Sequence, residues 1–329
     1  MKKELLNLPL KEKEKLILTE LDWKFNLEDS ETLYNLLKEE PEVFGLTKNK
    51  WLKDWLKQTT PASFSSQDFY SLIIFPLAHP AFLVKDIAFS KLRTFYWKHR
   101  LGPKRTVIEE VEKSVGRLTV VGAQGKRKSL GSCFRVAKDC VVTTRSGFAL
   151  LAPDFGKKTN FHLPGQLEVD FSNGRKKKPG QSFLVKKLIY AAPKTEPDLV
   201  IFQLEKKNFL QHAVPKQLSF SSQNPAGKIG LVIGYPHKIS KNLEHLAIFG
   251  SPWNLNRKRI APGHLHSRTQ SSCEFSHDCT TETGNAGSPV IDLATGHILG
   301  MHCHSIDKNQ GVAITARYIH EILKMVALK

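Results

Sequence analysis

The stretch TGNAGSPV at residues 283–290 is the most specific segment of this chain, and the prediction of the fold works outward from it. Gly284 and Gly287 permit a tight turn that residues with a Cβ atom resist. The apolar run 289–291 after the turn predicts a strand. A second turn at 294–296 leads to another short apolar run, 298–302. Two short strands joined by a glycine-containing turn are typical of an all-β domain.

More runs of this kind fill the chain after residue 105, each broken by Gly, Pro or Asn. They are residues 117–121, 132–136, 140–144, 183–190, 199–204, 228–233, 289–291 and 298–302. Strands at this spacing, without long helices between them, predict a sandwich or a pair of barrels. Apolar residues at helical spacing near the end predict a final helix over 317–328.

Residues 1–105 differ in character from the rest. Leucines recur there at helical spacing among Lys and Glu, which predicts a small helical N-terminal domain. Residues 69–75 and 82–97 are expected to form two of its helices, separated by Pro76 and Pro80. Residues 101–105 (LGPKR) are expected to form a linker. We therefore predict a helical domain over 1–105 and a β domain over 106–329.

Composition excludes several classes of protein. Of the 329 residues 40% are hydrophobic, and no apolar run approaches the length of ~18 residues that a transmembrane helix needs. Five cysteines without a secretory signal favour a reducing compartment, so we expect a cytoplasmic protein. The net charge is +18: residues 1–105 hold 18 Lys and Arg against 14 Asp and Glu, and residues 106–329 hold 31 against 17. This excess of positive charge in the β domain suits a polyanionic partner, and solvated loop tips of a soluble protein are the alternative.

Four segments resemble landmarks of trypsin-like serine peptidases, in the same order along the chain. They are GSCFRV at 131–136, VVTTRS at 141–146, PDLVIFQL at 197–204 and the TGNAGSPV stretch at 283–290. Residues 233–236 (IGYP) and 280–284 (TTETG) are similar to the intracellular branch of the family. The resemblance covers about residues 112–328 and implies an all-β double barrel of trypsin-like type.

At the three catalytic positions the resemblance places Ser146 where the family has its base, Asp198 as the acid and Ala286 where the family has its nucleophile. A serine nucleophile needs an imidazole to take its proton, and the imidazole needs a carboxylate to orient it. Loss of nucleophile or base alone costs about 10⁶ in kcat in a serine protease. No histidine lies between His99 and His162 to replace the base. We expect a pseudo-protease without enzymatic activity.

The resemblance also identifies the groups that would bind a substrate without taking part in proton transfer or bond cleavage. Backbone N–H groups of Gly284 and Ala286 correspond to the oxyanion hole and suit a peptide carbonyl or a carboxylate. Thr280, His302 and His304 correspond to the substrate pocket. Acid-specific relatives keep a histidine at the position of His302, which favours an acidic side chain as guest. Turn glycines without a binding role, and an ordinary buried histidine, are the alternatives.

Zinc-type ligands also gather upstream of the turn, at His264, His266, Cys273, His277 and Cys279. Their spacing matches no zinc finger, so ordinary loop and strand residues are the favoured interpretation. We expect neither a metal nor a cofactor.

The leading functional prediction is a protein-binding, regulatory module in an intracellular complex. One alternative is nucleic-acid binding through the basic runs, which are Arg175, Lys176, Lys177, Lys178, Arg257, Lys258 and Arg259. Another is a residual serine hydrolase with a displaced site, for which Ser288 is the candidate. A membrane partner is not expected.

Overall fold

The computed structural model describes residues 57–60, 68, 71, 75–84, 95–149, 165–174, 181–238, 243–249, 255–268, 272–307 and 310–327. The chain divides into two compact units. Unit 1 comprises Met1–Pro80, Ala88–Pro103 and Ile239–Leu255, and unit 2 comprises Ala81–Ile87, Lys104–Lys238 and Asn256–Lys329. The predicted helices before residue 57 lie outside the described residues.

The helices are α6 (Phe75–Ala78), α7 (Phe95–Leu101), α8 (Arg105–Glu112), α9 (Ser146–Ala149), α10 (Leu243–Phe249) and α11 (Ala316–Ala327), with 3-10 turns η6 (Gly102–Lys104) and η7 (Ala123–Gly125). Unit 1 holds α6, α7 and α10. Phe75, Trp97 and Phe249 are its large buried side chains. Ser71 Oγ donates to Glu244 Oε1 at 3.1 Å, and the Phe75 ring stacks on His245.

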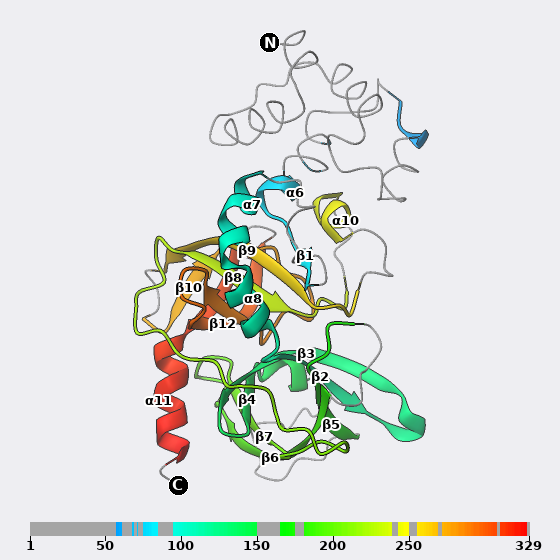
Figure 1. The fold of residues 1–329 in the computed structure, drawn as a ribbon, viewed down its shortest axis with the longest axis vertical. Coiled ribbons are helices and arrows are strands. Elements are labelled where there is room, and N and C mark those ends of the chain that lie inside the picture. The colour runs from blue at the N-terminus through cyan, green and yellow to red at the C-terminus, as the bar shows by residue number, and fades with distance from the viewer. Residues whose placement is uncertain are drawn as a thin grey trace. The chain divides into compact units, whose positions relative to one another are not determined.

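Unit 2 contains two closed barrels of six strands each (Figure 1). The first barrel is built from β2 (Val115–Val121), β3 (Arg127–Ala137), β4 (Cys140–Thr143), β5 (Gln166–Asp170), β6 (Ser182–Ala191) and β7 (Val200–Leu204), in the order β2-β3-β4-β7-β6-β5. All pairs are antiparallel. Its core is apolar, with Phe148, Phe171, Phe183 and Phe202 buried at its centre.

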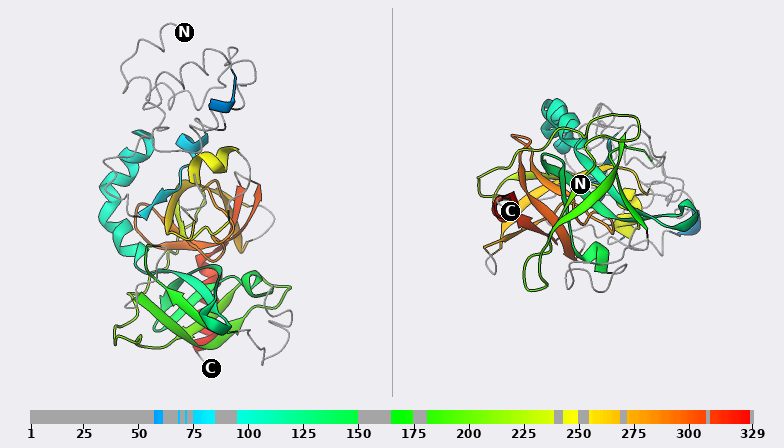
Figure 2. Two further views of the ribbon diagram at one scale, coloured as in Figure 1. Left: turned by 90° about the vertical axis from the view of Figure 1, so that its right-hand side faces the viewer. Right: turned by 90° about the horizontal axis from the view of Figure 1, so that it is seen from below.

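The second barrel is built from β8 (Ile229–Gly234), β9 (Arg259–Ser267), β10 (Glu274–His277), β11 (Pro289–Asp292), β12 (Ile298–Asp307) and β13 (Gln310–Thr315). The pairing of β8 with β9 closes the ring β9-β10-β13-β12-β11-β8. A short strand, β1 (Phe82–Leu83), adds to the outer edge of β9. Figures 1 and 2 show the green first barrel adjoining the yellow-to-orange second barrel within unit 2, with α11 extending beside them.

These observations confirm the predicted trypsin-like double barrel and its C-terminal helix. One local expectation was wrong. Phe82 and Leu83 form a strand instead of a helix, because β9 offers them backbone partners at Ile260 and Arg259. The segment expected to be a linker, residues 101–105, comprises the end of α7, η6 and the start of α8, and the division between the two units at Pro103 and Lys104 falls within it. None of the helices in the described residues is long and apolar enough to cross a bilayer.

Candidate functional site: the glycine turn at residues 283–288

The turn at residues 283–288 accepts only glycine at two positions. Gly284 has φ +108°, and a Cβ atom there would lie 2.4 Å from the carbonyl oxygen of Tyr235. Gly287 has φ +85°, and its Cβ would lie 2.1 Å from the carbonyl oxygen of Ser132. Side chains resist such backbone angles and have no space at these distances. The glycines are therefore required to form the turn.

Ser132 on β3 and His302 on β12 hold this turn in place through its backbone. The Ser132 N–H donates to the Ala286 carbonyl at 2.9 Å, and the Ser132 hydroxyl donates to the Gly284 carbonyl at 2.7 Å. The same hydroxyl accepts the N–H of Tyr235 at 2.9 Å. The Gly287 N–H donates to the His302 carbonyl at 2.9 Å. Sequence reasoning quoted Ser132 as part of a strand motif but missed this role.

The three positions predicted to correspond to the catalytic residues, 146, 198 and 286, contain one carboxylate, and among the described residues it has no histidine partner. Ala286 is half-buried on the turn, and Ser146 is the exposed first residue of α9. The backbone N–H of Ser146 donates to Asp198 Oδ1 at 3.0 Å. Asp198 is half-buried just before β7, and no histidine of the described residues is hydrogen-bonded to it. Ser146 thus contacts this carboxylate through its backbone; His162 lies outside the described residues.

Two amide donors remain at the turn. Within the described part of the chain, neither the N–H of Gly284 nor that of Ala286 has a hydrogen-bond partner. The His237 ring packs beside them, since its Nδ1 lies 2.5 Å from the place of a Gly284 Cβ. Burial lowers the pKa of His237, and the charges of Lys128 and Lys238 lower it further. This centre offers hydrogen-bond donors and positive charge, which suits an anionic group.

His237 was not among the predicted site residues. The only signal in the sequence was its position directly after the IGYP segment, whose Tyr235 contacts the turn.

The predicted pocket residues differ in exposure: Thr280 and His302 are buried, whereas His304 is exposed. His302 Nδ1 lies 3.0 Å from Nε2 of His277, so one ring nitrogen donates to the other. Burial lowers the pKa of His277 to about 4, and burial and His277 lower the pKa of His302 well below its usual value. Both imidazoles are therefore neutral at pH 7.

The five zinc-type ligands do not come together. His277 pairs with His302, and His264 Nδ1 lies 3.3 Å from Asp278 Oδ2. Cys279 is buried and Cys273 is half-buried, both as free thiols. No group of three or more His, Cys, Asp or Glu that could hold a metal occurs among the described residues.

Two residues of the predicted basic surface are buried, which corrects that expectation. Lys258 is fully buried, and its ammonium donates to Glu112 Oε2 at 2.8 Å and to the Phe171 carbonyl at 3.0 Å. Arg259 is 5% exposed and donates to the Ala81 carbonyl. Only Arg257 of this run lies partly exposed. Arg175, Lys176, Lys177 and Lys178 lie outside the described residues.

Ser288, the candidate for a displaced nucleophile, is fully buried. Its hydroxyl has no hydrogen-bond partner among the described residues, so no base is in place to take its proton. This geometry argues against hydrolysis at Ser288.

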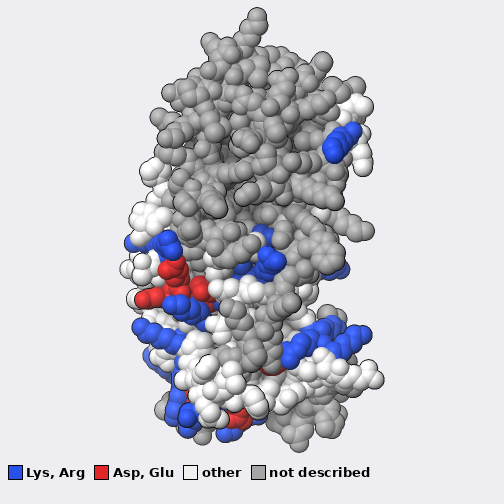
Figure 3. Space-filling view, turned by 45° about the vertical axis from the view of Figure 1, so that its right-hand side comes forward, with Lys and Arg blue, Asp and Glu red and all other residues white. Residues whose placement is uncertain are grey.

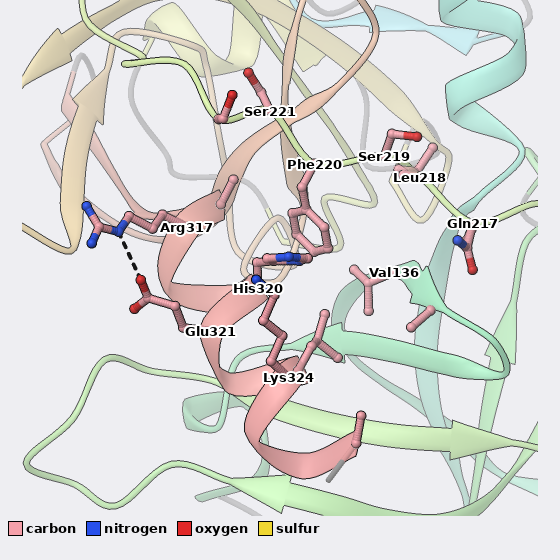
Figure 4. A pocket seen from close by; sticks show the side chains of 15 residues that line it. Val136, Gln217, Leu218, Ser219, Phe220, Ser221, Arg317, His320, Glu321 and Lys324 are labelled. Carbon is pink, nitrogen blue, oxygen red and sulfur yellow. Dashed lines mark hydrogen bonds and ion pairs between the residues drawn. The ribbon is translucent and has the colours of Figure 1, made fainter.

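A pocket of about 710 Å³ lies away from these positions, between α11 and residues 217–222 (Figure 4). The rings of Phe220 and His320 meet there at 5.3 Å, and Arg317 pairs with Glu321 at 2.9 Å. None of the degenerate catalytic residues lines it.

A double barrel whose turn, strand order and acid position follow the peptidase arrangement defines a chain of the trypsin-like class. The sequence profile of the trypsin-like peptidase domain family matches residues 131–301, more than half of the chain. The protein therefore belongs to this family. No curated protein matches the sequence.

Solved structures of serine proteases are among those similar to this chain. A serine endoprotease from Yersinia pestis is 14% identical to this chain, with a TM-score of 0.48. The match covers 68% of this chain and 66% of the Yersinia chain. This chain thus spans just under two thirds of that protein. Rv3671c from M. tuberculosis, as an inactive mutant, is 18% identical with a TM-score of 0.44, covering 68% and 91%. Its active form is 17% identical with a TM-score of 0.44, covering 67% and 83%.

Proposed function

We propose that this protein is a catalytically inert trypsin-like domain that binds a protein partner inside the cell, in a regulatory role. The observation that carries the proposal is the state of Asp198: its carboxylate accepts the backbone N–H of Ser146, and the turn carries the methyl group of Ala286. Without hydroxyl and imidazole the acylation step has neither attacking atom nor proton acceptor.

The former substrate cleft is the proposed contact, and an acidic segment of the partner is the proposed guest. The amides of Gly284 and Ala286, which have no partner in the part of the chain that the structure describes, suit a carbonyl or carboxylate oxygen. Lys128 and Lys238 lie close enough to His237 to lower its pKa, and the His237 ring lies beside Gly284, so positive charge is present near this end of the turn. Their long-range field favours capture of an acidic segment at low salt.

The chemical half of the proposal is tested by restoring the missing groups. The full chain is incubated with a fluorophosphonate probe, which labels an activated serine. We expect no labelling of the natural chain or of Ala286→Ser, because that hydroxyl has no base, and measurable labelling of Ala286→Ser combined with Ser146→His. Labelling of any serine in the natural chain would show that the domain is an enzyme.

The binding half is tested with fluorescent peptides that carry Glu or, as matched controls, Gln. We expect the full chain to bind the Glu peptides, and His304→Glu to weaken this binding at least tenfold by repulsion. His320→Glu is the control, since His320 is equally an exposed histidine but lies on α11. Equal binding of the Glu and Gln peptides would show that the site does not prefer an acidic segment. No partner in a native pull-down together with no peptide binding would remove the protein-binding role.

One observation favours nucleic-acid binding as a second candidate. Lys126, Arg127 and Lys128 are all exposed at the hairpin between β2 and β3, and basic side chains predominate over acidic ones on the face in Figure 3. Affinity that comes from phosphate contacts falls steeply with salt. We expect the triple change to Gln to flatten this salt dependence in a gel-shift assay with RNA and DNA. Nucleic-acid binding with an affinity that does not change with salt concentration would exclude binding through phosphate contacts.

A further inference from the structure

The turn after β7 exposes an aromatic side chain almost completely. Phe209 is 93% exposed and Leu210 beside it is 47% exposed. Large apolar side chains in water forgo the free energy that their burial would release. The value for Phe209 is the highest among the exposed large hydrophobic residues of the described chain.

This exposure is built into the turn, because Asn208 fixes the backbone on both sides of the tip. The Asn208 side chain is buried, and its Oδ1 accepts the N–H groups of Leu210 at 3.0 Å and His212 at 2.9 Å. The Asn208 N–H donates to the His212 carbonyl at 3.1 Å, and Gln211 adopts φ +63° to close the turn. A bridge between Lys207 and Ala213 anchors its base. A rigid frame therefore holds Phe209 out into solvent.

Four lysines lie in this turn or on the strand paired with β7. Lys206 and Lys207 lead into the turn, and Lys186 and Lys187 lie on the neighbouring strand β6; all four are exposed. The Glu205 N–H donates to the Leu184 carbonyl at 2.9 Å, which places a third exposed apolar residue beside them. Residues 182–191 and 204–213 contain no acidic residue except Glu205.

We propose that this apolar-basic turn, defined as Lys206–His212 with Leu184, Lys186 and Lys187, docks the protein onto the surface of an anionic membrane. A Phe–Leu tip suits the boundary between headgroups and acyl chains, and lysines around it suit a diffuse layer of negative lipid charge. A nucleic acid would use Phe209 for base stacking, but it gives Leu210 and Leu184 no comparable partner. The expected lack of a membrane partner rested on the missing transmembrane segment, and docking at the surface requires none.

The proposal is independent of the state of the catalytic centre. It is tested by co-sedimentation of the full chain with vesicles of phosphatidylcholine alone or with 30% phosphatidylserine. We expect binding to the anionic vesicles only, weakened at least tenfold by Phe209→Ser with Leu210→Ser. Changing the four lysines to Gln should abolish it. Met325→Ser is the matched control, because Met325 is an exposed apolar residue on α11 and should leave binding unchanged.

Two results would overturn the proposal: equal binding to both kinds of vesicle, or full binding after the Phe209 and Leu210 changes. Loss of single-stranded RNA binding in the Phe209 variant, without any vesicle binding by the natural chain, would instead assign the turn to nucleic acid. All substituted side chains are exposed, so circular dichroism should show an unchanged fold.

Discussion

Replacing Lys258 by Met should lower the free energy of unfolding of this protein far more than replacing its neighbour Arg257. The Lys258 ammonium has no exposure and donates to the Glu112 backbone carbonyl, to Glu112 Oε2 at 2.8 Å and to the Phe171 carbonyl at 3.0 Å. In Lys258→Met the Glu112 carboxylate stays buried, and Asn173, at 3.2 Å, is the one side-chain donor left to it among the described residues. Breaking a buried pair from one side costs about 3–5 kcal/mol, because an uncompensated charge remains.

The assay is urea unfolding of the full chain at pH 7, followed by far-ultraviolet circular dichroism. Arg257→Met removes the same charge from a partly exposed site and should change the free energy of unfolding by about 0.5 kcal/mol or less. Adding Glu112→Leu to Lys258→Met should recover part of the loss, since it removes the unpaired carboxylate. If Lys258→Met and Arg257→Met have equal effects, the buried pair does not hold these segments together.

Three further outcomes are expected. Gly284→Ala should lower the free energy of unfolding by roughly 3 kcal/mol or more, because of backbone strain and steric overlap. Gly227→Ala, at φ +77° with open space around it, should lower it by roughly 1 kcal/mol. Equal shifts of the melting temperature in the two variants would contradict this. The pKa of His277 is lowered to about 4, so the unfolded chain binds a proton at this histidine before the folded protein does. The free energy of unfolding should therefore be highest above pH 6.5 and decrease by about 3 kcal/mol toward pH 4, at ~1.4 kcal/mol per pKa unit. His277→Gln should flatten this dependence of the melting temperature, and an unchanged slope would refute the assignment. Ellman's reagent should modify the half-buried Cys140 and Cys273 in the native protein and all five thiols in denaturant. Fast reaction of a third thiol in the native protein would show that one of the other three cysteines is not buried.

Strands with apolar sequence and turn signals at both ends were predictable, and eight such runs coincide with observed strands. Strand β9 was missed because Pro262 and Gly263 break its pattern. Its neighbours explain why proline is tolerated. On one side β1 pairs with residues 259–260 and β10 with residues 265–267, so Pro262 lies where β9 has only β8 beside it. A proline that need not donate to a neighbour costs the sheet little.

The burial of Lys258 could not be predicted from its neighbours. Between Arg257 and Arg259 it has the sequence pattern of a solvated loop, and its partner Glu112 lies 146 residues earlier. Local patterns carry no information on such a distant pair. The turn at residues 283–288 was easier to predict, because its backbone requires glycine at 284 and 287.

The contacts that shape the nucleophile turn use none of the side chains that perform peptidase chemistry. Ser132 binds the carbonyls of Gly284 and Ala286, and Thr143 Oγ1 donates to the Ser132 carbonyl at 2.7 Å. Glycine conformation and backbone hydrogen bonds therefore set the turn, whichever side chain stands at 286. A methyl group at 286 and a serine at 146 disturb none of these contacts. The side chains at 286 and 146 can therefore differ without a change in the turn, which implies that Ala286→Ser should leave stability unchanged.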